Sequence, residues 1–114
     1  MARPTARREA PAALAPAASG PPRASRFRLR CTWSGAGPRS EGAIEGWFGD
    51  GQEQLYPRPH ALPVDHLPAL GGRGGAPNPL ELLLQALASC LTCALVLNAA
   101  ARGIRLDGVE LDVE

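Results

Sequence analysis

Two cysteines lie in the longest apolar stretch of the chain and are its clearest candidates for chemistry. Cys90 and Cys93 form the sequence CLTC within residues 71–104. Thiols at this spacing serve as redox nucleophiles or as metal ligands. The first cysteine of a redox CxxC motif usually lies at a helix N-terminus, which lowers its pKa. Both cysteines here fall in the middle of a predicted helix, so thioredoxin-like chemistry is disfavoured.

A metal site at these cysteines would need further ligands. Structural zinc sites take four protein ligands, and the two histidines, His60 and His66, lie in a proline-rich segment. We therefore predict no metal site and no cofactor, and keep a metal-binding module built on Cys90 and Cys93 as a weaker alternative. The glycine-rich sequence GGRGG (71–75) lacks the GxxxxGK[ST] pattern, which argues against nucleotide binding.

The apolar stretch predicts one long helix. Asn78 is a favoured N-cap, Pro79 suits the first helical position, and Glu81 can complete a capping box. Gly103 is a natural helix stop. These signals give a helix of about 24 residues, or about 36 Å at 1.5 Å per residue.

This helix is long enough to span a membrane, but its polar residues argue against that location. They form one stripe within about 80° of arc, which favours the buried central helix of a soluble protein. The stripe consists of Glu81, Gln85, Ser89 and Thr92. We predict no association with a membrane.

The helical periodicity places the two thiols differently. Cys90 lies about 180° from Glu81, within an apolar arc, and Cys93 lies about 60° further round, towards the polar stripe. We therefore expect Cys90 to face packed apolar surface, where a free cysteine can also act as a small buried hydrophobe. The neighbours on its face are Leu83, Ala86, Ala94 and Leu97.

A reactive thiolate at Cys90 would need a positive charge from another element, because Cys90 is too far from the helix N-terminus to gain from it. Arg73, in the glycine-rich loop, is one candidate. The other candidates are Arg26, Arg28, Arg30 and Arg39.

The segments around the helix alternate like strands. Residues 25–33 place Phe27, Leu29, Cys31 and Trp33 between arginines and Thr32, which predicts a half-buried strand. A second strand is predicted over 43–49, with DGQ (50–52) closing a hairpin. The four prolines in 52–70 exclude a helix and a central strand, so a loop with short extended pieces is expected there. Residues 109–114 alternate again and predict a final strand.

The composition of the chain limits its domain organisation, its partners and its location. The 114 residues form one small domain, 26–114, after an Ala/Pro/Arg-rich tail, 1–25, that is expected to be disordered. The net charge of +1 and the scarcity of aromatic residues disfavour a nucleic-acid partner. An odd count of three cysteines fits a reducing compartment, so we predict a cytoplasmic location.

The sequence from GGRGGAPNPLELLLQALASCLT to ARGIRLDGVELDVE resembles the osmotically inducible protein C (OsmC) and organic hydroperoxide resistance (Ohr) family. The resemblance rests on the glycine-rich loop, Asn78-Pro79, Ser89-Cys90 and the exit ARGI before a strand. It implies an α+β fold in which N-terminal antiparallel strands precede a long buried helix and a final strand, within an intertwined homodimer. It also implies that the chain corresponds to the N-terminal portion of such a domain, truncated in its C-terminal half.

The resemblance further implies a thiol-dependent peroxidase that reduces organic hydroperoxides in oxidative stress defence. Cys90 would then be the peroxidatic cysteine, with a thiol reductant as second substrate. Cys93 is a candidate resolving cysteine and Arg73 a candidate thiolate-stabilising residue. Because a chain this small buries little surface alone, we expect it not to fold stably as a monomer.

An alternative reading is not catalytic. Family members often carry Glu directly after the Asn-Pro pair, and this chain has Leu80 there. The chain could then be an inactive or truncated relative that acts as a small-molecule-binding or structural remnant. Peroxidase turnover separates the two readings.

Overall fold

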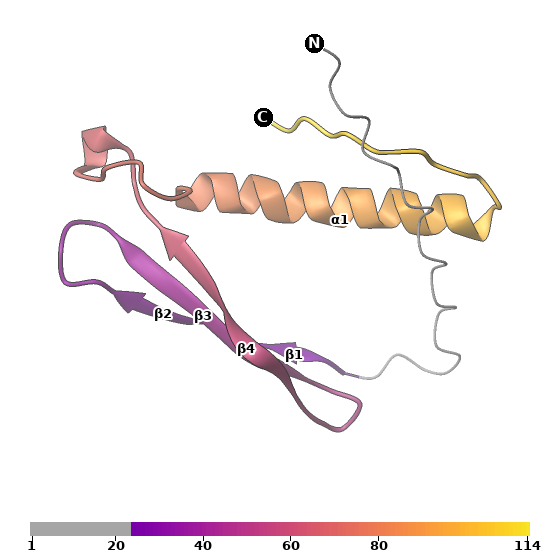
Figure 1. Cartoon of the computed structure of the whole chain (residues 1–114), viewed down its shortest axis with the longest axis horizontal. Coiled ribbons are helices and arrows are strands. Elements are labelled where there is room, and N and C mark those ends of the chain that lie inside the picture. Colours follow the sequence, from indigo (N-terminus) through magenta and orange to yellow (C-terminus); the bar gives the residue numbers. More distant parts are fainter. Residues whose placement is uncertain (1–23) are drawn as a thin grey trace, which may run out of the picture.

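The structure, a computed structural model, describes residues 24–114 and has an α+β architecture. A small antiparallel sheet is followed by one long helix (Figure 1). The elements in chain order are β1 (Arg26–Phe27), β2 (Arg30–Trp33), β3 (Ser40–Gly49), β4 (Gln52–Val64), a 3-10 turn (Pro68–Leu70) and α1 (Pro79–Ala101). Nearly all of the predicted tail, 1–25, lies outside the described residues.

Strand β3 is the centre of the sheet. At one end Phe48 pairs with Arg26 of β1 and with Glu53 of β4. Because one strand residue has one neighbour on each side, β1 and β4 must lie on opposite edges of β3. Strand β2 continues the edge that β1 begins, so the predicted strand 25–33 is present but interrupted at Arg28 and Leu29. The prediction that it is half-buried is wrong, because its residues are exposed.

The β3–β4 hairpin turns where the sequence predicts. Asp50 and Gly51 both have positive φ, 52° and 77°, as a type I′ turn requires. Gly49 and Gln52 form the pair that closes the turn. The predicted DGQ hairpin is confirmed.

The loop predicted over the proline-rich segment is wrong, because most of it forms the 13-residue strand β4. The ladder is interrupted between the pairs Ile44–His60 and Gly46–Leu55, where Glu45 alone faces four residues of β4. Pro57 and Pro59 lie in this bulge, so their missing N–H groups remove no regular ladder bond. Within the described residues β4 pairs only with β3, which makes it the edge strand that prolines tolerate.

Helix α1 confirms the predicted capping signals. The Glu81 N–H donates to Asn78 Oδ1 at 2.9 Å, and the Asn78 N–H donates to Glu81 Oε2 at 3.3 Å. At the other end Gly103 adopts φ 67°, and the Ile104 N–H donates to the Ala99 carbonyl at 2.8 Å. This is a Schellman motif, which satisfies the last carbonyls of the helix.

The prediction that α1 is a buried central helix is wrong for the single chain. Ala99 is the one buried apolar side chain of the described residues. The extensive contacts between elements join β3 to its neighbours, and none of similar extent joins α1 to the sheet. Figure 1 shows the helix and the sheet diverging from the loop that connects them.

The segment after α1 turns back and runs along the helix (Figure 1). Leu106, Val109 and Val113 are half-buried on it. The structure assigns no strand to 109–114, because this segment lies along the helix without a strand to pair with among the described residues. It covers a helix face whose half-buried or buried residues are Leu84, Ala88, Thr92, Val96 and Ala99.

Candidate functional site

An exposed apolar seam runs the length of α1, opposite the face that the C-terminal segment covers. Its residues alternate between spacings of three and four positions, the pattern of a helix that packs against another helix. All of them are exposed. The seam consists of Leu80, Leu83, Leu87, Cys90, Ala94, Leu97 and Ala101.

Cys90 lies at the middle of this seam. At 100° per residue it is about 180° from the centre of the covered face. The expectation that Cys90 faces packed apolar surface is therefore wrong in the isolated chain, where its side chain is exposed and not in a disulfide. The seam residues around Cys90 are apolar, as the helical periodicity predicts. They are nevertheless exposed, with no element of residues 24–114 packed on them.

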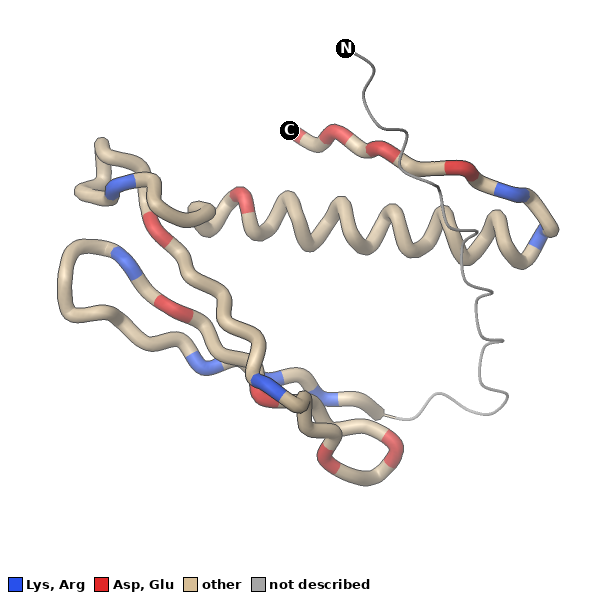
Figure 2. Tube along the Cα trace, viewed as in Figure 1, with Lys and Arg blue, Asp and Glu red and all other residues tan. Residues whose placement is uncertain are grey.

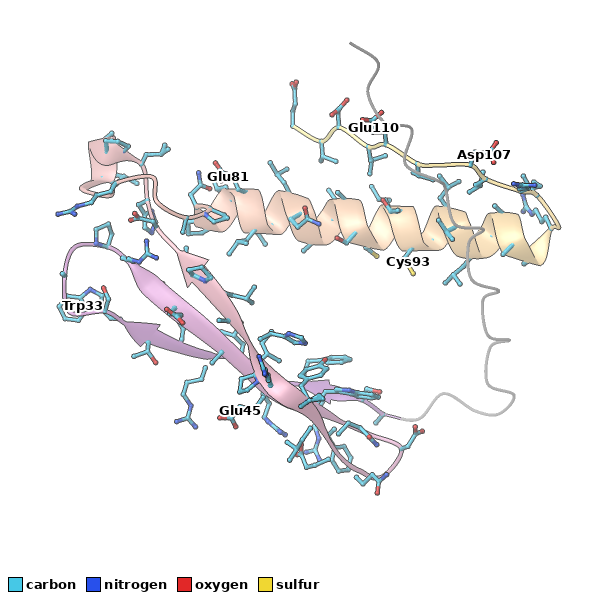
Figure 3. The ribbon with its side chains drawn as sticks, in the orientation of Figure 1. Trp33, Glu45, Glu81, Cys93, Asp107 and Glu110 are labelled. Carbon is cyan, nitrogen blue, oxygen red and sulfur yellow. The ribbon has the colours of Figure 1, made fainter. Side chains whose placement is uncertain are left out.

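Cys93 lies one turn further along the helix and is also exposed and free. Its side chain points away from the C-terminal segment, on the opposite side of α1 (Figure 3). The two thiols therefore share the uncovered side of the helix. The third cysteine, Cys31, is exposed on β2 and paired across the ladder with Gly42, far in sequence from both.

The uncovered side of α1 carries no charged side chain near the thiols. Between Glu81 and Arg102 the sequence has no Asp, Glu, Lys, Arg or His, and Figure 2 shows no Lys, Arg, Asp or Glu along this length of the helix. Cys90 makes no hydrogen bond to an arginine among the described residues. Cys90 lies eleven positions, or about 16 Å, along the helix from Pro79. Arg73 precedes Pro79 in the loop before α1.

Three of the other candidate arginines are held elsewhere in the sheet region. Arg28 forms a bidentate ion pair with Glu53 at 2.7 Å, and Arg26 lies over the Phe48 ring at 4.7 Å. Arg39 Nη1 lies 3.9 Å from Asp65 Oδ2. The structure therefore brings none of these three guanidinium groups to Cys90 within one chain.

Sequence reasoning missed Asp65, the one buried charged residue of the described chain. Its carboxylate accepts the backbone N–H of His66 at 2.8 Å and those of Arg73 and Gly75 at 3.2 Å. The His66 bond is the main cause that holds the pKa of Asp65 below its usual range; the Gly75 and Arg73 bonds and the charge of Arg39 add to it, against the opposing effect of burial. The available signal was an Asp placed between a strand and a glycine-rich loop, where this side chain commonly binds backbone N–H groups.

The structure also places the histidines and the helix considered above for a metal site and a membrane span. The rings of His60 and Tyr56 in β4 lie tilted against each other with 4.3 Å between their centroids. No group of three or more metal-ligating side chains occurs in residues 24–114. By length and composition α1 could cross a membrane, a test that core helices of soluble proteins also pass.

Comparison with known families identifies one match. Residues 72–114 match the family model described as OsmC-like protein. The matched part contains most of the glycine-rich loop, all of α1 and the C-terminal segment, so the predicted resemblance is confirmed for this part of the chain. No curated protein matches the chain.

Proposed function

We propose that this chain, with its OsmC-like residues 72–114, is a cytoplasmic thiol-dependent peroxidase for organic hydroperoxides. The observation that carries the proposal is the exposed Cys90 thiol at the centre of an apolar seam. An oxidant can reach this sulfur in the single chain, and a dimer formed through the seam must leave an opening to it. The leucines beside the sulfur favour a hydroperoxide with an apolar group over hydrogen peroxide.

The reaction needs two thiols and a dithiol reductant. The Cys90 thiolate attacks one peroxide oxygen, the O–O bond breaks, and the alkoxide takes a proton and leaves as an alcohol. Cys90 is then a sulfenic acid. Attack by the Cys93 thiolate forms a disulfide and releases water, and a dithiol reductant returns both cysteines to thiols.

The position of Cys93 fits this role with one local change. Side chains three positions apart on a helix are neighbours, with Cβ atoms about 5–6 Å apart. A disulfide needs about 3.5–4.5 Å between Cβ atoms. The helix must therefore tighten locally around Leu91 and Thr92 when the disulfide forms.

Activation of Cys90 requires a cation, and no arginine of residues 24–114 forms a hydrogen bond with this thiol within one chain. A homodimer provides a route, because the apolar seam of one copy can pack on that of another and bring in the partner's arginines. Arg73 is the proposed thiolate-stabilising residue in this arrangement. Its loop leads directly into α1, so an antiparallel arrangement in which only the N-terminal halves of the two seams overlap would bring the loop of one copy beside Cys90 of the other.

The test is peroxidase turnover with tert-butyl hydroperoxide and dithiothreitol. Cys90→Ser should abolish turnover, and Cys31→Ser, which removes an equally exposed thiol from the sheet, should leave it unchanged. A sulfenic-acid trap followed by mass spectrometry should label Cys90 in the Cys93→Ser variant. Turnover that survives Cys90→Ser, or a trap that labels Cys31 and not Cys90, would refute the proposal.

A second candidate function is binding without catalysis. The absence of charge between Glu81 and Arg102 and the presence of Leu80 favour an apolar small-molecule binder or a structural remnant. In that case the wild-type protein shows no turnover with a dithiol, although an apolar fluorescent probe still binds to the seam.

A further inference from the structure

A pocket of about 510 Å³ lies between the β2–β3 turn and the glycine-rich loop, away from the seam of α1. Its volume falls in the range of small-molecule sites. The turn is held by its own polar contacts, since Trp33 Nε1 donates to the Gly37 carbonyl at 2.7 Å and Ser34 Oγ donates to the Arg39 carbonyl at 3.0 Å. Trp33 can be followed beside this turn in Figure 3. The pocket is lined by Ser34, Ala36, Gly37, Pro38, Arg39, Asp65, Gly71, Gly72, Arg73 and Gly75.

Asp65 fixes one side of the pocket. It accepts the backbone N–H groups of Arg73 and Gly75 in the glycine-rich loop and lies 3.9 Å from Arg39 Nη1, which comes from the β2–β3 turn. The same carboxylate therefore ties the two walls together. Its negative charge is compensated by these donors, so it opposes an incoming anion less than a free carboxylate would.

Gly75 lies beside the Arg39 guanidinium. A Cβ at this position would lie 3.4 Å from Arg39 Nη1, at the lower limit of ordinary van der Waals contact. Its N–H also donates to Asp65. The residue at 75 is thus fitted to both members of the ion pair, and the guanidinium is held in place while its side chain remains 44% exposed.

The pocket has cationic donors that the protein does not use. Within residues 24–114 the Arg39 guanidinium makes its ion pair with Asp65 and no hydrogen bond, and the side chain of Arg73 has no partner. Two arginines against one carboxylate leave one net positive charge. Ala36, Pro38 and the glycine backbone supply apolar surface beside these groups.

We propose that this pocket binds a small organic anion, in which a carboxylate or phosphate group meets Arg39 and Arg73 and a small apolar group lies on Ala36 and Pro38. Guanidinium groups bind both kinds of anion through paired N–H donors. The site does not involve Cys90 but shares Arg73 with the proposed peroxidase, so its test measures anion binding and not turnover.

The test is an NMR titration of the full chain with benzoate, phenyl phosphate and benzamide, which share a ring and differ in charge. Benzoate or phenyl phosphate should produce saturable shifts of the Gly72 and Gly75 amides, and the stronger of the two identifies the preferred anionic group. Benzamide should not. Shifts of equal size with benzamide, or no saturable shift with either anion, would overturn the proposal.

Three arginine variants locate the site. Arg39→Gln and Arg73→Gln should each weaken anion binding by about tenfold or more, because each removes charge-assisted hydrogen bonds. Arg58→Gln removes the same charge from the exposed bulge of β4 and should leave binding unchanged. Since Arg73 has no side-chain partner to lose among residues 24–114, its variant remains informative if Arg39→Gln disturbs the fold. Equal affinity in Arg73→Gln and Arg58→Gln would refute the assignment.

Discussion

At the scale of single residues, the Asp65 side chain connects more segments of the chain than the side chain of Cys90 or Cys93 does. One buried carboxylate connects the end of β4, the glycine-rich loop and the β2–β3 turn. The identity of this residue could not be predicted as important from the sequence, because its partners are backbone N–H groups eight and ten positions away. Every residue type except proline can supply those groups.

Asp65 should make the stability of the chain sensitive to acid. Its folded pKa is lowered, chiefly by the His66 N–H, so its contribution is complete above the unfolded value of about 3.9 and is lost as pH falls through the lower folded value. We expect Asp65→Asn to lower the melting temperature at pH 7 and to lose less stability than the wild type between pH 7 and pH 3.

Thermal melts at both pH values check this prediction. Glu110→Gln is a suitable control, because the Glu110 side chain points away from α1 (Figure 3). It should follow the wild-type pH dependence. An Asp65→Asn protein as stable as the wild type at pH 7 would contradict the role given to this carboxylate.

At the scale of elements, the sequence predicts a helix or strand well where the residues that define it lie close together in the chain. The limits of α1 follow from Asn78, Pro79, Glu81 and Gly103, all of which act within one turn of a helix end. Strand β4 could not be predicted in the same way. Pro57 and Pro59 are compatible with a strand because the ladder to β3 is interrupted at Glu45, and that interruption depends on the partner strand.

The glycine at the end of α1 should be required for its backbone conformation. Gly103 has φ 67°, and an added Cβ would meet no atom within 4 Å, so the cost of Gly103→Ala is purely conformational. We expect a loss of about 1 kcal/mol in the free energy of unfolding.

Gly108→Ala is the matched control, because its Cβ also meets nothing within 4 Å and its backbone is not left-handed. Urea unfolding followed by circular dichroism should give the difference between the two variants. Equal stabilities would show that the Schellman motif does not hold the end of the helix.

At the scale of the whole molecule, the chain exposes what a folded domain normally buries. Leu80 and Leu83 are 71% and 66% exposed, and four more leucines of α1 are about half exposed. The periodicity of α1 correctly identified an apolar arc around Cys90, but it could not show whether the same chain covers that arc. Burial depends on elements far apart in the sequence, and here the sheet lies away from the helix.

The proposed dimer should depend on the seam. Leu87→Glu places a charge in the apolar face next to Cys90, and we expect the dimer to weaken by about tenfold or more, because a buried unpaired charge is costly. Gln85→Glu adds the same charge on the side of α1 that the C-terminal segment covers, and should leave association unchanged. Sedimentation equilibrium measures both. A wild-type chain that sediments as a compact, cooperatively melting monomer would contradict the dimer.

The C-terminal segment has a consequence for how many copies can join. It lays Val109 and Val113 on one flank of the helix and presents Glu110 and Asp107 to water. The apolar seam on the opposite face of α1 then remains available for association. When two helices pair through one self-complementary apolar face, each covers the face of the other and assembly stops at a dimer. A helix with two uncovered apolar faces would instead allow open-ended assembly.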